Sequence, residues 1–140
     1  MTFSPNDYLN GLVSWDDNEF SVGVQELDAQ HKVIVQCINK LYLAIESDSE
    51  CQQLPSLFET LIEYTGYHFE TEQRYFHHLS KHEQLLHHLH HKHFLEEISM
   101  LHVNRENTRV TAIELLFLLT DWLISHILEE DKQLVQAELE

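Results

Sequence analysis

Apolar side chains recur every three or four residues in four separate stretches of this chain, and each stripe also contains a histidine or an acidic residue. A three-to-four-residue repeat is the period of an α-helix, whereas a half-buried strand alternates every second residue. The chain has only three glycines and two prolines in 140 residues, so few positions favour a break. The sequence therefore predicts an all-α fold.

The expected architecture is an up-down-up-down four-helix bundle. At 140 residues the chain is long enough for one domain, which we divide into a non-helical N-terminal arm (1–24) and the bundle (25–140). Pro55 suits the start of a helix. The four helices are predicted at about residues 26–46, 55–79, 83–103 and 109–138.

Polar side chains take the place of apolar ones near one end of each stripe. His68 and Glu72 are four residues apart, so both lie on one helix face, and the same holds for His87 and His91. A buried polar group without a partner costs roughly 1–3 kcal/mol, so these side chains need a common partner. The complete set is His31, His68, Glu72, His87, His91, His126 and Asp131.

Five imidazoles and two carboxylates indicate two metal ions rather than one. Seven ligands exceed the four of a tetrahedral zinc site, and calcium and magnesium prefer oxygen donors. Two iron ions are the natural choice. If both carboxylates and an oxo or hydroxo group bridge the pair, three histidines give one iron six ligands and two histidines give the other five. The count predicts one open position, suited to a small diatomic molecule.

The spacing from His126 to Asp131 is five residues, which on a regular α-helix turns the two side chains about 140° apart. A π-bulge would bring positions i and i+5 back toward one face. We therefore expect a departure from α-helical hydrogen bonding in this stretch.

Composition limits the partners and the compartment. The formal net charge is −16, which makes nucleic acid and anionic membrane surfaces poor partners. Two cysteines without metal-binding spacing, and an N-terminus without a secretory pattern, favour the cytoplasm. The apolar stretch 115–128 is shorter than the roughly 20 residues that span a bilayer, so it is expected to be a buried helix.

Four motifs resemble those of the bacterial hemerythrins over nearly the whole chain. They are the opening segment from Trp15 to Lys32, the His68-Phe69-Glu70-Thr71-Glu72 stretch, the His87-x-x-x-His91-x-x-Phe94 stretch, and the segment from Trp122 through His126 to Asp131. The resemblance implies a non-haem di-iron centre that binds O2 reversibly, for storage, delivery or sensing. It also implies O2 as the ligand and leaves room for an O2-consuming partner protein.

The resemblance also implies a role for each residue. His87, His91 and His126 would bind the saturated iron, His31 and His68 the iron with the open position, and Glu72 and Asp131 would bridge them. The apolar groups similar to those lining the family's O2 pocket are Ile34, Phe69, Trp122 and Ile127.

Two alternatives remain open. The same metals would serve a di-iron oxidase or peroxidase, or a protein that handles nitric oxide or iron, although no positioned acid or base is evident. The other histidines are expected to lie on solvated faces, with a weak surface site for zinc, copper or nickel as the alternative; they are His77, His78, His82, His88, His90, His93 and His102.

Overall fold

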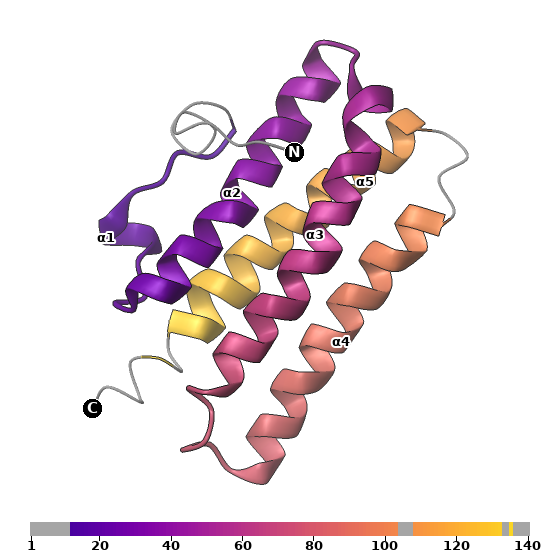
Figure 1. The fold of residues 1–140 in the computed structure, drawn as a ribbon. Helices are drawn as coiled ribbons and strands as arrows, with labels where there is room; N and C mark the ends of the chain where they lie inside the picture. The colour runs from indigo at the N-terminus through magenta and orange to yellow at the C-terminus, as the bar shows by residue number, and fades with distance from the viewer. Residues whose placement is uncertain (1–11, 104–107, 133–134, 136–140) are drawn as a thin grey trace.

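Long helices packed side by side form the structure, a computed structural model that describes residues 12–103, 108–132 and 135. These residues contain helices and turns and no strand, so the all-α prediction is confirmed. Consecutive long helices run in opposite directions (Figure 1). The helices are α1 (Asp17–Phe20), α2 (Gln25–Glu46), α3 (Glu50–Gln73), α4 (Lys81–Val103), α5 (Thr108–Asp121) and the π-helix η2 (Trp122–Asp131), which continues α5.

The apolar stripes meet in one core between the long helices. Ile34, Ile38 and Leu41 of α2 are buried there with Leu61 of α3 and Leu115 of α5. Each fully buried aliphatic side chain contributes about 1.5–3 kcal/mol relative to exposure. The same stripes carry the polar set toward the end of the bundle where α3 turns into α4 (Figure 1).

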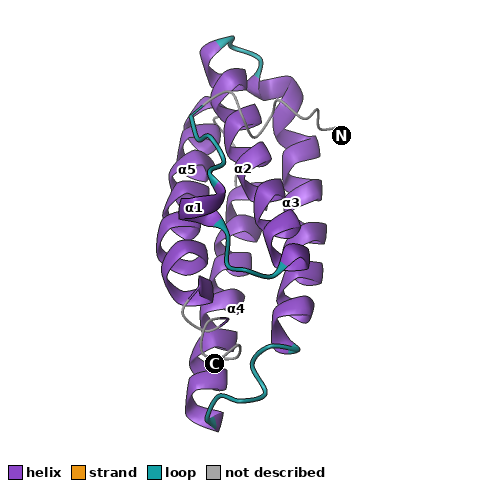
Figure 2. Ribbon diagram, turned by 90° about the vertical axis from the view of Figure 1, so that its left-hand side faces the viewer, coloured by secondary structure: helices purple, strands orange, loops and turns teal. Residues whose placement is uncertain are grey.

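The N-terminal arm contains a short helix, so the prediction that it is wholly non-helical is wrong in the described part. Asp16 caps α1 by accepting a hydrogen bond from the Asn18 amide at 3.0 Å, a local signal typical of a helix start. The Asn39 side chain binds both backbone groups of Val13, at 2.8 and 2.7 Å. These bonds hold the arm along the side of the bundle (Figure 2).

Helix α3 begins at Glu50, five residues before the predicted start at Pro55. Ser49 occupies the cap position, and its carbonyl accepts the amides of Gln52 and Gln53 at 3.1 and 3.2 Å. Proline inside a helix removes one hydrogen bond, here to the carbonyl of Cys51. Because Cys51 is exposed, water can bind that carbonyl instead.

Helix α3 ends at Gln73, six residues before the predicted end at residue 79. Turns closed by hydrogen bonds between residues three apart follow, such as the bond from the Tyr75 amide to the Glu72 carbonyl at 2.8 Å. Phe76 turns inward in this loop and is 5% exposed. Burial of this side chain stabilises the loop conformation. The helical periodicity of the sequence does not indicate this. Helix α4 then begins at Lys81, and the predicted end of the last helix at residue 138 lies outside the described residues.

The expected departure from α-helical bonding is confirmed, because residues 122–131 form a π-helix. It spans ten residues, more than a local bulge. A wider helical turn brings positions five apart onto one side. As a result, both His126 and Asp131 are buried at the same end of the bundle.

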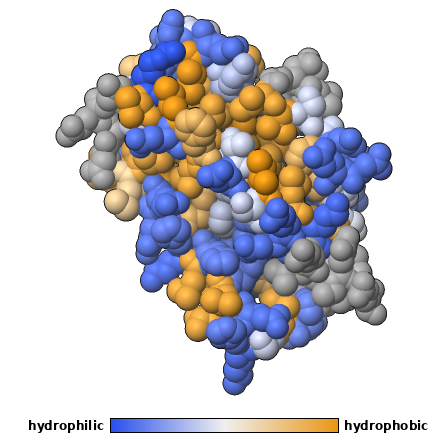
Figure 3. Space-filling view, turned by 180° about the vertical axis from the view of Figure 1, so that it is seen from behind, coloured by the Kyte–Doolittle hydropathy of each residue, from blue (hydrophilic) through white to orange (hydrophobic). Residues whose placement is uncertain are grey.

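One helix in the described part of the chain, Thr108–Asp131, is long and apolar enough to cross a membrane by length and composition. The helix is therefore longer than the apolar stretch 115–128 identified in the sequence, because α5 and η2 join into 24 residues. Only 39% of its most apolar window is buried. The helix packs against α2, α3 and α4, and Figure 3 shows a broad apolar area on the rear face of the molecule.

Candidate metal centre

All seven residues of the predicted set meet at one end of the bundle, although they come from four helices. Each is at most 5% exposed, and His31 is fully buried. Helix α2 supplies His31, α3 supplies His68 and Glu72, α4 supplies two histidines, and η2 supplies the rest. Their donor atoms fall into two groups that share both carboxylates.

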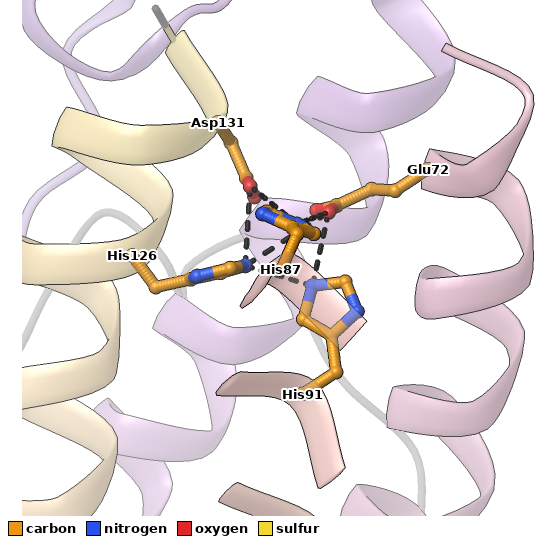
Figure 4. A group of neighbouring side chains, drawn as sticks. All are labelled: Glu72, His87, His91, His126 and Asp131. Carbon is orange, nitrogen blue, oxygen red and sulfur yellow. Dashed lines mark hydrogen bonds and ion pairs between the residues drawn. The ribbon is translucent and has the colours of Figure 1, made fainter. Parts of the chain in front are cut away.

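The first group contains three imidazoles, drawn in Figure 4. The Nε2 atoms of His87 and His91 lie 3.0 and 3.2 Å from Oε2 of Glu72. Nε2 of His126 lies 3.1 Å from Oδ1 of Asp131 and 3.8 Å from the same Glu72 oxygen. The five side chains point toward one common space from three different helices (Figure 4).

The second group contains two imidazoles. His68 Nε2 contacts Oε1 of Glu72 and lies 3.7 Å from Oδ2 of Asp131. His31 Nε2 lies 3.4 Å from that Asp131 oxygen and 4.0 Å from Oε1 of Glu72. Each carboxylate therefore turns one oxygen toward the three-histidine group and the other toward the two-histidine group.

Several donor atoms in this centre have no hydrogen-bond partner. Both ring nitrogens of His31 and both oxygens of Asp131 are buried without one. A buried polar atom without a partner destabilises the folded protein, so another group is needed to satisfy these atoms. Nitrogen and carboxylate donors at these separations are the donor set of a transition-metal site, so the residues present fit metal ions.

A chain of hydrogen bonds fixes the orientation of His68. The amide of Gln30 donates to Thr71 Oγ1 at 3.0 Å, and this hydroxyl donates to the Tyr67 carbonyl at 3.0 Å. The other atom of that amide, Oε1, must then accept from His68 Nδ1, 2.6 Å away. With the hydrogen on Nδ1 donated to Gln30, the ring turns Nε2 toward the carboxylates, where it could bind a metal once it has lost its proton.

Glu130 orients His126 in the same way. Its Oε2 lies 3.1 Å from His126 Nδ1, so this nitrogen donates and Nε2 faces the centre. The hydrogen bond from His126 holds the pKa of Glu130 at about 2. Sequence reasoning missed both Gln30 and Glu130, although Gln30 directly precedes His31 and Glu130 stands four residues after His126.

Burial lowers the pKa values of the imidazoles, and the neighbouring carboxylates raise them. Burial lowers the pKa of His126, but Asp131 and the other carboxylates outweigh it and raise that pKa to about 11. For His68 the balance is similar, and Glu72 with Asp131 raises the pKa to about 9. Burial dominates at His91 and lowers its pKa to about 4. The centre therefore holds protons when it holds no cation, and a metal must displace them.

Aromatic rings pack directly against the imidazoles. Phe69 stacks on His91, with ring centroids 3.7 Å apart, and lies 6.0 Å from the ring of His68. Trp122 stacks on His126 at 3.9 Å, and Phe94 stacks on the far side of Trp122 at 4.0 Å. These apolar rings cover faces of the imidazoles and hold them in place.

The four residues expected to line an O2 pocket take different positions. Ile34 and Ile127 are buried in the core, at 1% and 0% exposure. Phe69 touches imidazoles of both groups, whereas Trp122 lies beside the three-histidine group.

Comparison with known proteins gives the family. The model of the hemerythrin HHE cation binding domain matches residues 22–137. This chain belongs to the hemerythrin family. Its hemerythrin relatives include a bacteriohemerythrin of Pseudomonas aeruginosa strain LESB58, 31% identical over 123 residues, which are 88% of this chain and 79% of that protein. A bacteriohemerythrin of Clostridium acetobutylicum is 22% identical over 126 residues, with 86% of this chain and 97% of that protein covered.

Membership of the hemerythrin family agrees with the geometry. The family description names a cation-binding domain. The buried histidines and carboxylates form two metal-binding groups, and each group draws its residues from three helices. Together they support a di-iron site in this chain.

Proposed function

We propose that this hemerythrin-family chain holds two iron ions and binds O2 reversibly at one of them. One observation carries the proposal: Glu72 and Asp131 each turn one oxygen toward the three-histidine group and the other toward the two-histidine group. Two carboxylates shared in this way suit a bridged metal pair. When bound, the iron pair would supply the electrons that O2 takes up on binding and returns on leaving.

The roles of the residues follow from this arrangement. His87, His91 and His126 would hold one iron, and His31 and His68 the other. The second iron would have one imidazole fewer, so we assign the open position for O2 to it. We propose Ile34, Phe69 and Ile127, together with Trp122, as the apolar lining that excludes water from the bound ligand.

The chain's own groups favour binding over turnover. The Nδ1 atoms of His68 and His126, which face away from the centre, already form hydrogen bonds. His68 bonds to Gln30, and His126 bonds to Glu130. These contacts hold the two rings in place. The Tyr64 hydroxyl is buried, and burial raises its pKa well above the ordinary value, so it is a poor proton donor. An oxidase, a peroxidase, or a protein that handles nitric oxide or iron is the second candidate.

The test is to load the protein with ferrous iron without air, admit air, and then remove the O2 under argon. Metal content of two irons per chain, and a visible absorption band that appears with air and disappears with argon, are expected. Irreversible oxidation in the first cycle, or turnover of an added peroxide substrate, would favour the enzyme instead. A plateau at one iron per chain would contradict the assignment of the two groups.

A further inference from the structure

A pocket of about 260 Å³ opens on the surface between α4 and the continuous α5–η2 helix. Its lining includes Phe94, Trp122 and His126, so it reaches the outer side of the three-histidine group. Trp122 stacks on His126 there, and Phe94 stacks on Trp122. The pocket is therefore a surface opening next to the buried centre.

Cation ligands gather around this opening from both sides. His90, His93 and Glu97 lie three and four residues apart, which places them on one face of α4. Asp121 and Glu130 line the opposite side. Two imidazoles and three carboxylates thus surround one open space, and imidazole with carboxylate is a donor set that suits iron and zinc.

Glu130 connects the surface to the interior. Its Oε2 lies 3.3 Å from Nδ1 of His90, a histidine that is 53% exposed. The same oxygen lies 3.1 Å from Nδ1 of His126 and 3.9 Å from Nδ1 of His87. Donor atoms of His90, His126 and Glu130 all lie within 4.8 Å of one another. A cation held at His90 is therefore one side chain away from the centre.

A second opening serves as a comparison. A pocket of about 560 Å³ reaches His87 and His91 from the other side and is lined by His77 and His88. Its lining contains no carboxylate, in contrast to the three around the first pocket. Carboxylates in a cleft raise the local concentration of cations, so the first pocket is the more attractive to a metal ion.

We propose that the pocket between α4 and η2 captures a divalent first-row transition-metal ion from solution and delivers it to the buried centre. His90, His93 and Glu97 bind the incoming ion on one wall, and Glu130 passes it inward. The delivery step rests on the proposed function, because its destination is the iron pair. The capture step stands on the pocket alone.

The kinetic test compares two triple variants on the same helix. His90→Ala with His93→Ala and Glu97→Gln removes the ligands on α4. His82→Ala with His88→Ala and Glu83→Gln is the matched control, because it removes the same three side-chain types from exposed positions elsewhere on α4. Metal-free protein is mixed with ferrous ion without air, stopped with a chelator at set times, and assayed for bound iron.

The pocket variant should take up iron about tenfold more slowly than wild type, with an unchanged final content. The control variant should match wild type. Equal rates in the two variants would overturn delivery through this pocket, and slower loading in the control would place the entrance at the other opening. A wild-type plateau below two irons would contradict the proposed function instead.

Capture has its own readout, independent of the centre. Zn²⁺ added to the protein should shift the imidazole NMR signals of His90 and His93 before those of His82 and His88. Signals of all four that move together, or not at all, would show that the pocket is no specific site.

Discussion

The Nε2 atoms of His91 and His126 lie 2.9 Å apart, closer than two unprotonated nitrogens would approach. One of them must carry a hydrogen. The pKa of His126 is raised to about 11 and that of His91 is lowered to about 4, so His126 donates to His91. A proton thus stands where the proposed function puts a metal.

The metal-free protein should lose stability as the pH rises. His68 and His126 have folded-state pKa values of about 9 and about 11, above the ordinary histidine pKa of 6.5. Their stabilising contribution is complete below pH 6.5 and is lost as the pH rises through the folded values. Thermal unfolding followed by circular dichroism should show a falling midpoint between pH 6.5 and about 9.

The metal-loaded protein is the control for this pH dependence. Its ligands are already deprotonated, so its midpoint should hold constant or rise over the same interval. The measurement stays below pH 9 because burial raises the pKa of the Cys37 thiol from 9.0 to about 12, so above pH 9 this thiol would ionise in the unfolded chain and add its own pH dependence. Parallel curves for the two forms would show that His68 and His126 do not hold protons as described.

His126→Ala should prevent the protein from holding two irons. The change removes one of three imidazoles in its group and the surface on which Trp122 stacks. Iron content after gel filtration should fall to one per chain or less. His82→Ala, at an exposed position on α4, should keep the wild-type content. If both variants retain two irons, His126 is not a ligand.

Gln30→Leu should weaken metal binding without removing a proposed ligand. The His68 ring loses the acceptor that fixes its hydrogen on Nδ1, and such an outer contact is worth about 10–100-fold in metal affinity. Competition with a chelator measures the change. Gln36→Leu, a half-buried position on the same helix, is the matched control and should leave the affinity unchanged. An equal affinity in both variants would assign Gln30 a packing role only.

Ile127→Ala should leave the iron content intact and accelerate oxidation of the O2-bound protein. The side chain is fully buried, so its truncation should cost about 2–5 kcal/mol in the free energy of unfolding and open space for water near His126. Ile38→Ala removes an equally buried side chain two helical turns from His31. Similar oxidation rates in the two variants would remove Ile127 from the proposed O2 pocket.

Much of the bundle was predictable because the helical period fixes where side chains point along each segment. Spacing placed the i,i+4 pair His68 with Glu72 on an inward face, whereas the resemblance to the hemerythrins was needed to select His87 with His91 among the clustered histidines. The five-residue step from His126 to Asp131 predicted a local π-bulge, because both side chains needed to face the same interior, and the structure has a ten-residue π-helix there. The bounds were less accurate, as the early start of α3 before Pro55 shows.

The sequence by itself determined which seven side chains face inward and that four helices bring them to one end of the bundle. Only the tertiary structure decided which carboxylate oxygen faces which histidines, that Gln30 of α2 orients His68 of α3, and that α3 ends at Gln73, before the buried Phe76. These features depend on distances between helices, which are set by the packing of side chains remote in sequence. Periodicity describes one helix at a time and contains no such distances.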